Sequence, residues 1–293
     1  MLMNKKPCLI LSYFIALSLS ADVNAIDVMP DGAFAPPPDL NAYMVAVNHV
    51  ELGDKYQDGN KLNLGTELSL SALLLRYTRT FTINDNPAGF YIQPSFVYAD
   101  PGGSLSSNQS EFDLGDTALA LAYWPYVNHD AGRYFALAGY LVAPTGDYDS
   151  NRLINPGGNR WSWVTQAIFH DMLSDKWGYM FAVDSQWFQD NDDYRLTHQN
   201  HEQDPLYLTQ ATLNYKPDSS LMFSVSYFHN FGAKEKLDGV TVTDDISNGR
   251  VGLTMIKRSK AGKLIVRYVK GLEPENGFIK EHQLYIRWHF TLN

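Results

Sequence analysis

Apolar and polar residues alternate along the chain from Phe90 to Phe290, in runs of about ten residues that turns and loops separate. Short turns rich in Asn, Asp, Gly and Pro alternate with long polar loops. A barrel threaded through a membrane from one side keeps short turns at one end and long loops at the other, whereas a soluble sandwich has long connections at both. The pattern therefore predicts a transmembrane antiparallel up-and-down β-barrel. The short turns lie at residues 84–88, 128–132, 173–176, 217–220 and 260–262, and the long loops lie near residues 100–115, 145–160, 189–205, 232–248 and 271–280.

The alternating runs number about twelve, and an even count places both chain ends on the periplasmic side of a bacterial barrel. No run after the N-terminus reaches the roughly 18 continuous apolar residues that a transmembrane helix needs. We therefore expect an all-β fold. The expected strands lie near residues 41–51, 66–82, 90–99, 116–127, 134–144, 161–172, 177–188, 206–216, 221–231, 249–258, 263–270 and 281–291.

The first 25 residues have the three parts of a secretory signal peptide. Lys5 and Lys6 form a basic start, residues 9–19 form an apolar core, and small residues end at Ala25. We predict cleavage after Ala25. Because the single cysteine, Cys8, lies in this segment, the exported chain would have no disulfide and would depend on its own hydrogen-bond ladder.

Residues 26–40 include three consecutive prolines at positions 36–38. Proline has no N–H to donate to a strand ladder, so this segment is not expected to be a strand. We interpret it as a short, Pro-rich periplasmic leader that is too short for a folded plug domain. The barrel is then expected over residues 41–293, after a signal peptide at 1–25.

Successive side chains of each expected strand face lipid and lumen in turn. In the last strand, Leu284 and Ile286 fall on the lipid face, whereas Tyr285, Arg287 and His289 fall on the lumen face. A cation at mid-membrane depth on the lipid face costs roughly 2–4 kcal/mol, so charge is expected to face inward. The same division places Trp177, Tyr179, Phe181 and Val183 on the lipid face, and Asp184, Gln186, Gln210 and Asn214 in the lumen.

Composition agrees with a membrane barrel and excludes some partners. The chain has 18 Tyr, 15 Phe and 6 Trp, which form girdles at the two membrane interfaces of such barrels. The net charge is −9 and becomes −10 when Lys5, Lys6 and Asp22 leave with the signal peptide. Nucleic acid is therefore not an expected partner, because binding it requires basic surface. We expect a monomer in contact with outer-membrane lipid and lipopolysaccharide.

Two sequence blocks resemble motifs of a known family. The first is Phe112-Asp113-Leu114-Gly115-Asp116, and the second is Ala143-Pro144-Thr145-Gly146-Asp147-Tyr148, followed by residues 155–161. They are similar to those of the bacterial family named for the meta-pathway of phenol degradation. The resemblance covers residues 41–290 and implies an outer-membrane transporter, often encoded with pathways that degrade aromatic or other hydrophobic compounds.

The Pro-Thr-Gly-Asp block has a structural role and a functional one to consider. Pro144 would end a strand ladder, Gly146 permits positive φ, and Asp147 can accept hydrogen bonds from loop amides. The block, with Thr145, is therefore expected to fold a loop, and contact with a solute remains an alternative. Gly115 and Asp116 have the same two interpretations.

Basic residues are assigned to the lumen on neighbouring strands: Arg250, Arg267, Arg287, His289 and, after closure, Arg79. Together with Tyr285, such a wall could attract anions or polarise a carboxylate or phenolate in transit. Alternatively, each cation pairs with a lumen carboxylate and only supports the barrel. In the strand of residues 66–82, Leu73-Leu74-Leu75 breaks the alternation, and we expect a β-bulge there.

Metal binding and catalysis are weakly indicated. The loop at 189–205 has several Asp residues and two His, but lacks the Gly and distal Glu of a dedicated calcium loop. We expect a solvated acidic surface, with no metal or cofactor. The nearest Ser–His pairs, His170 with Ser185 and His229 with Ser226, lack the local context of outer-membrane phospholipases, so no catalytic residue is expected.

These observations predict an outer-membrane channel for passive uptake of small hydrophobic or aromatic solutes. The chain has no nucleotide-binding motif and hence no energy source of its own. The alternative is a non-selective or structural barrel that interacts through its external loops.

Overall fold

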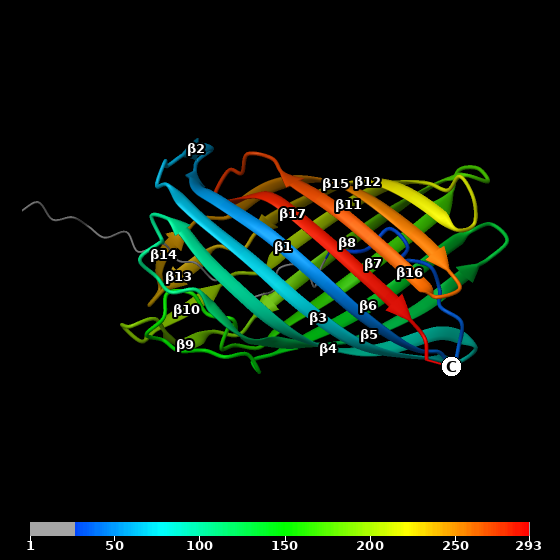
Figure 1. Ribbon diagram of the computed structural model, residues 1–293, viewed down its shortest axis with the longest axis horizontal. Coiled ribbons are helices and arrows are strands. Elements are labelled where there is room, and N and C mark those ends of the chain that lie inside the picture. Colours follow the sequence, from blue (N-terminus) through cyan, green and yellow to red (C-terminus); the bar gives the residue numbers. More distant parts are fainter. Residues whose placement is uncertain (1–26, 293) are drawn as a thin grey trace, which may run out of the picture.

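A computed structural model describes residues 27–292, and in it the chain forms a closed antiparallel barrel (Figure 1). The predicted signal peptide and Ile26 lie outside these residues. Among residues 27–292, no helix is long and apolar enough to cross a membrane. The elements of the described residues are β-strands.

The barrel has twelve principal strands, each hydrogen-bonded to the next, and the last strand pairs with the first to close the wall. The all-β class and the strand count predicted from the sequence are confirmed. The strands are β1 (Asn41–Gln57), β3 (Thr66–Ile83), β4 (Asn86–Gly103), β5 (Glu111–Asn128), β6 (Arg133–Ala143), β7 (Ser162–Met172), β8 (Trp177–Phe188), β11 (Leu206–Tyr215), β12 (Leu221–Gly232), β15 (Ile246–Ser259), β16 (Gly262–Gly271) and β17 (Gly277–Phe290), with a two-residue extension, β2 (Asn60–Lys61), beside β1.

Short turns lie at the end of the barrel that holds the C-terminus, at the right of Figure 1. In the turn between β3 and β4, Asn84 and Asp85 both have positive φ, at 50° and 64°. Two consecutive positive φ values define the type I′ turn, which Asn and Asp tolerate better than most residues. The turn chemistry therefore fixes where β3 and β4 reverse.

Successive side chains of the strands face the outer surface and the lumen in turn, as predicted. Phe181 and Val183 are each 54% exposed on the outer surface, whereas Asp184 and Gln186 are buried inside. The expected bulge in β3 is wrong: its pairing with β1 continues without a shift past Leu74. The three leucines are accommodated because the residues before and after Leu74 face out while Leu74 faces the lumen.

Four further strands lie outside the wall at the long-loop end, at the left of Figure 1. Two loops that are separated in the sequence pair through β10 and β13, so a small sheet forms at this end. The sequence did not predict it, because strands of three to five residues carry little pattern. The strands are β9 (Asn191–Tyr194), β10 (Gln199–Gln203), β13 (Glu235–Leu237) and β14 (Val240–Thr243).

Residues 27–36 run inside the barrel and residues 37–39 are exposed at its short-turn end, which corrects the interpretation of residues 26–40 as an extended periplasmic leader. Met29 packs into a cluster of side chains that face inward from the wall. Ala33 is fully buried and packs near Trp124. The segment is too short for an independent domain, but the wall supplies the hydrophobic contacts that it could not make alone.

Candidate functional site

The N-terminal segment, defined as residues 27–40, is held against the inner face of the barrel wall first by hydrogen bonds to its backbone. The Gln210 side chain on β11 accepts from the Val28 amide at 3.0 Å and donates to the Val28 carbonyl at 2.9 Å. Arg267 on β16 donates to the same carbonyl at 2.6 Å and to the Thr254 hydroxyl at 3.1 Å. Because the segment is not part of the sheet ladder, wall side chains satisfy its backbone groups.

Three ion pairs, made by two carboxylates, anchor the same segment. Arg250 on β15 donates through two nitrogens to the Asp27 carboxylate, each at 2.8 Å. Asp31 accepts from Lys263 at 2.7 Å and from Arg258 at 3.2 Å. Both carboxylates are buried, and a buried charge is tolerated only when it is paired. The N-terminal segment thus neutralises three cations of the β15–β16 wall.

Further contacts carry the segment across the lumen to the β3–β7 side. Trp124 on β5 donates its indole N–H to the Ala33 carbonyl at 2.9 Å. The Phe34 ring lies edge-on to His170 at 4.7 Å between ring centroids. Near the short-turn end, the Thr80 hydroxyl donates to the Pro37 carbonyl at 2.7 Å. The segment is therefore fixed at both ends and in its middle.

A cavity of about 310 Å³ remains between the N-terminal segment and the wall. It is lined from Thr80 and Trp124, near the short turns, to Asn48 and Val142, nearer the long loops. One side is apolar and made of small side chains because β5 and β6 place alanines inward. These are Ala118, Ala120, Ala122, Ala136 and Ala138.

The other side of the cavity is polar and comes from β3, β4 and β17. The Arg76 guanidinium lies over the Tyr91 ring at 3.7 Å and donates from Nε to Gln93 at 2.8 Å. Arg287 lines the cavity and contacts His289 through its Nε atom. Tyr91 and Tyr140 approach to 6.2 Å between ring centroids across Ala120, whose small side chain leaves them room.

The structure separates the basic residues assigned to the lumen into three groups. Tyr285, Arg287 and His289 line the cavity, as the sequence predicted. Arg250 and Arg267 face inward, but they hold the N-terminal segment, which corresponds to the alternative in which cations support the barrel.

Arg79 does not face the lumen, and that assignment is wrong. It pairs across the ladder with Phe90, which is 43% exposed on the outer surface, and its Nη2 atom lies 3.1 Å from the Asp39 carboxylate. The physical reason is the missing bulge: with regular alternation, Arg76, Thr78 and Thr80 point inward and Arg79 points out. The sequence analysis did not assign Arg76 to the lumen. Its position did carry a signal, because Arg76 is an even number of residues from buried Leu68 and Leu70 and therefore lies on the same face of β3.

The family loop residues fold the long-loop end beside the cavity. The Asp116 carboxylate accepts from the Gly146 amide and the Gly158 amide, each at 2.9 Å. Thr145 accepts from the Thr117 amide at 3.0 Å. β6 ends directly before Pro144, as expected of a residue without an N–H. Gly115 is equally constrained, because an added Cβ would lie 2.5 Å from the Ser95 hydroxyl.

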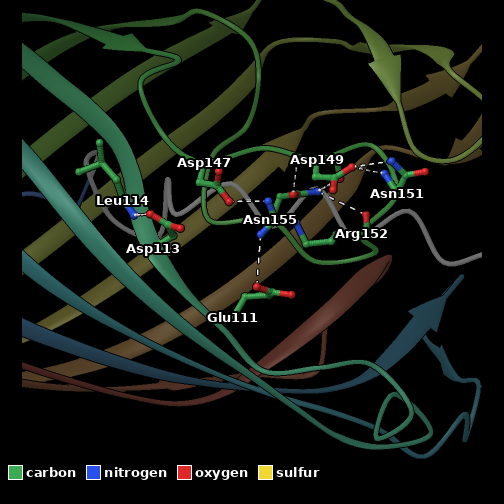
Figure 2. Close-up of polar contacts among 8 residues, drawn as sticks. All are labelled: Glu111, Asp113, Leu114, Asp147, Asp149, Asn151, Arg152 and Asn155. Carbon is green, nitrogen blue, oxygen red and sulfur yellow. Dashed lines mark hydrogen bonds and ion pairs between the residues drawn. The ribbon is translucent and has the colours of Figure 1, made fainter.

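Figure 2 shows the polar contacts that extend this loop. Arg152 bridges Asp147 and Glu111, with its Nη1 atom 3.2 Å from the Glu111 carboxylate. Asn155 accepts from the Asp149 amide at 2.9 Å. Asp147 of the motif therefore folds the loop through a direct contact with Arg152. Asp116 additionally lines the cavity, so the solute-contact alternative stays open for that residue.

The Ser–His pairs considered for catalysis do not share a face. His170 is fully buried inside the barrel, while Ser185 lies beside outward-facing Thr165 and Tyr207. Ser226 is buried inside and bonds Thr212 at 2.9 Å, whereas His229 stacks with outward-facing Phe231. A nucleophile and its base must be within hydrogen-bond reach, so neither pair forms a dyad.

The external sheet has its own buried polar cluster. His201 on β10 is 1% exposed and stacks on Tyr194 at 4.4 Å between ring centroids. Burial, together with the nearby cations Arg160 and Arg195, lowers the pKa of His201 to about 3. His201 is therefore neutral at physiological pH, packed as an aromatic core residue of the external sheet.

A closed antiparallel barrel with an apolar outer surface, short turns at one end and long loops at the other defines the class: the protein is a bacterial outer-membrane β-barrel, with the fold of outer-membrane channels. The short-turn end is then periplasmic and the long-loop end external. The chain belongs to the family described as "Putative MetA-pathway of phenol degradation", whose model matches residues 53–288. The resemblance seen in the loop motifs is thus confirmed.

Solved structures show the same fold. The chain is similar to an outer membrane channel from Pseudomonas putida F1, with a TM-score of 0.86 and 24% identity over 91% of this chain and 100% of that chain. It is also similar to the β domain of the Bordetella autotransporter BrkA, with a TM-score of 0.53 and 12% identity over 87% of this chain and 100% of that chain. No curated protein matches the chain by sequence.

Proposed function

We propose that this barrel admits small hydrophobic or aromatic solutes by passive diffusion, through the cavity between the N-terminal segment and the β3–β7 wall. The observation that carries the proposal is the row of inward alanines on β5 and β6. In a barrel otherwise filled by side chains and by its own N-terminus, these small residues leave space along one wall. An apolar cavity of ~150 Å³ binds benzene, so about 310 Å³ has room for a substituted ring.

The family name, the fold and the narrowed lumen are each consistent with transport of a small solute. The family name associates the chain with phenol degradation, and the fold is shared with an outer membrane channel. The N-terminal segment narrows the lumen, which favours compact solutes over the bulk hydrophilic flow of a wide, water-filled porin.

A cavity-filling substitution tests the proposal. Ala138→Phe on β6 places a ring in the cavity, and Ala167→Phe on β7 is the matched control because Ala167 pairs with outward-facing Leu137 and Val183. The readout is uptake of labelled benzyl alcohol by intact cells with equal amounts of each variant in the outer membrane. Ala138→Phe should slow uptake several-fold relative to the parent, and Ala167→Phe should not.

Equal uptake by the parent, by both variants and by cells without the barrel would contradict the proposal. That result would favour the structural alternative, in which the ordered external sheet of β9, β10, β13 and β14 is the working surface. Equal slowing by both variants would also contradict it, because the effect would then come from assembly and not from the cavity.

A further inference from the structure

The cations of the lumen differ in whether they have an acidic partner. Arg250 is paired with Asp27, and Arg258 and Lys263 are paired with Asp31. Within residues 27–292, no carboxylate oxygen lies within 4.0 Å of a side-chain nitrogen of Arg76 or Arg287. The N-terminal segment thus pairs Arg250, Arg258 and Lys263 with carboxylates and leaves two guanidinium groups that line the cavity without one.

These two guanidinium groups lie on one part of the wall. Arg76 on β3 is opposite Met44 of β1, and Met44 is opposite His289, two residues beyond Arg287 on β17. Arg76 and Arg287 are close enough to repel each other, and Asp31, which pairs with Lys263 and Arg258, offsets this repulsion only in part. Two like charges facing one cavity are stabilised by an anion between them, because each otherwise loses hydration without gaining a partner.

Both groups are also oriented by neighbouring side chains. Arg76 lines the cavity, stacks on Tyr91 and bonds Gln93 through Nε, so its terminal nitrogens are not used in that bond. Arg287 uses Nε in its contact with His289. A guanidinium whose Nε is held presents its terminal N–H groups in a fixed fork, which matches the two oxygens of a carboxylate.

Two acidic residues line the cavity, and both are bonded elsewhere: Asp27 pairs with Arg250. The two Asp116 oxygens accept backbone amides of Gly146 and Gly158 at the external end. The apolar side of the cavity is the alanine row of β5 and β6, which β4 separates from β3. The cavity therefore has a cationic side and an apolar side, an arrangement complementary to a hydrophobic molecule with a single anionic group.

We propose that the preferred solute is a hydrophobic carboxylic acid, bound with its carboxylate between Arg76 and Arg287 and its apolar body against the alanines of β5 and β6. This inference rests on the proposed function and deepens it by naming the solute class. The body is an aromatic ring or a short aliphatic chain, since alanine side chains accept either.

The test compares charged and neutral ligands of matched shape on the purified full-length barrel in detergent. Calorimetry measures binding of benzoate, benzyl alcohol, octanoate and octanol to the parent and to Arg76→Gln, Arg287→Gln and the double variant. Arg79→Gln is the control, since Arg79 is on the same strand but points out of the lumen. The two acids distinguish an aromatic from an aliphatic body.

Benzoate or octanoate should bind the parent at least about tenfold more tightly than the matched alcohol, as expected for one charge-assisted contact. Each Gln variant should lose most of that preference while its affinity for the alcohol stays the same, and Arg79→Gln should behave like the parent. Arg76→Lys and Arg287→Lys should keep part of the preference, because Lys retains charge but not the fork. A gel shift on heating verifies that each variant is folded.

Equal affinity of the parent for acid and alcohol would overturn the inference, as would an equal loss of acid binding in Arg79→Gln. The two proposals can fail separately. If Ala138→Phe slows benzyl alcohol uptake but the parent shows no preference for acids, the proposed path stands and the anion site does not. If neither alcohol nor acid binds and Ala138→Phe changes nothing, both proposals are wrong.

Discussion

At the scale of single residues, side-chain facing is the property that the structure fixes most strictly. Phe181 lies 54% exposed on the outer wall, and Gln186, on the same strand, is 2% exposed inside. An odd or even position on a strand decides whether a residue meets hydrocarbon or the lumen. A polar substitution therefore has opposite consequences at adjacent positions.

Phe181→Arg should impair assembly, because a cation on the lipid face costs roughly 2–4 kcal/mol at mid-depth. Gln186→Ser is the control, because Gln186 faces the lumen and its side chain donates a 3.3 Å hydrogen bond to Ser162, so a shorter polar side chain there should be tolerated. The amount of heat-modifiable protein in outer-membrane fractions measures both. Equal amounts of the two variants would show that the register is wrong.

Glycines in the family loop give a second residue-scale prediction. A Cβ at Gly146 would lie 2.7 Å from the Gly157 backbone and 2.9 Å from the Asp116 amide nitrogen, so Gly146→Ala should destabilise the loop by ~1–3 kcal/mol, the usual cost of overpacking. Gly139→Ala, whose nearest contact is 4.0 Å away, should have little effect. Proteolysis of the external loops of folded protein reads out the difference, and equal cleavage rates would contradict this account.

At the scale of elements, the N-terminal segment and the external sheet are the two parts that the barrel wall does not explain. The segment converts the lumen from an open cylinder into a narrow cavity, because Asp27, Val28 and Asp31 occupy the polar groups of β11, β15 and β16. The external sheet joins two loops around buried His201.

The external sheet should loosen in acid. The pKa of His201 is lowered to about 3 in the closed sheet, against 6.5 for an exposed histidine. When the sheet opens, His201 binds a proton below pH 6.5, whereas the closed sheet does not until about pH 3. The stability of the sheet should therefore be complete well above pH 6.5 and fall between pH 6.5 and 3, by up to about 1.4 kcal/mol per pH unit in the middle of that range.

Hydrogen-exchange protection of the β10 and β13 amides, corrected for intrinsic rates, measures this loss between pH 7 and pH 5. His201→Phe preserves a ring against Tyr194 and should remove the pH dependence, while His198→Gln, at a largely exposed position, should leave it unchanged. Protection that is independent of pH in the parent would contradict the prediction.

At the scale of the whole molecule, closure is the decisive property. β17 pairs with β1 over most of its length, so the sheet has no free edge in the membrane and its backbone groups are bonded within the wall. The unboiled mature protein should therefore migrate differently from the boiled protein on a denaturing gel. Identical migration would mean that the wall does not close in solution.

The sequence by itself determined the barrel, because alternation, turn chemistry and loop length are local properties. The positions of β8, β11 and β16 and the outward or inward facing of Phe181, Gln210 and Arg267 followed from the period of two. The loop motif was recognisable for the same reason: Pro144 and Gly146 act on the backbone where they stand.

Only the tertiary structure decided what occupies the lumen and which of its cations have no carboxylate partner. Whether Arg250 meets Asp27, 223 positions away, depends on how the N-terminal segment crosses a closed barrel, and no local pattern encodes that distance. Arg79 was assigned to the lumen, but Arg76 faces it instead, because the alternation of β3 continues without the expected bulge, and a bulge would reverse the facing of every residue beyond it. The candidate site is therefore a product of closure: the alanines of β5 and β6 and the arginines of β3 and β17 share a cavity because the wall brings β17 back beside β1.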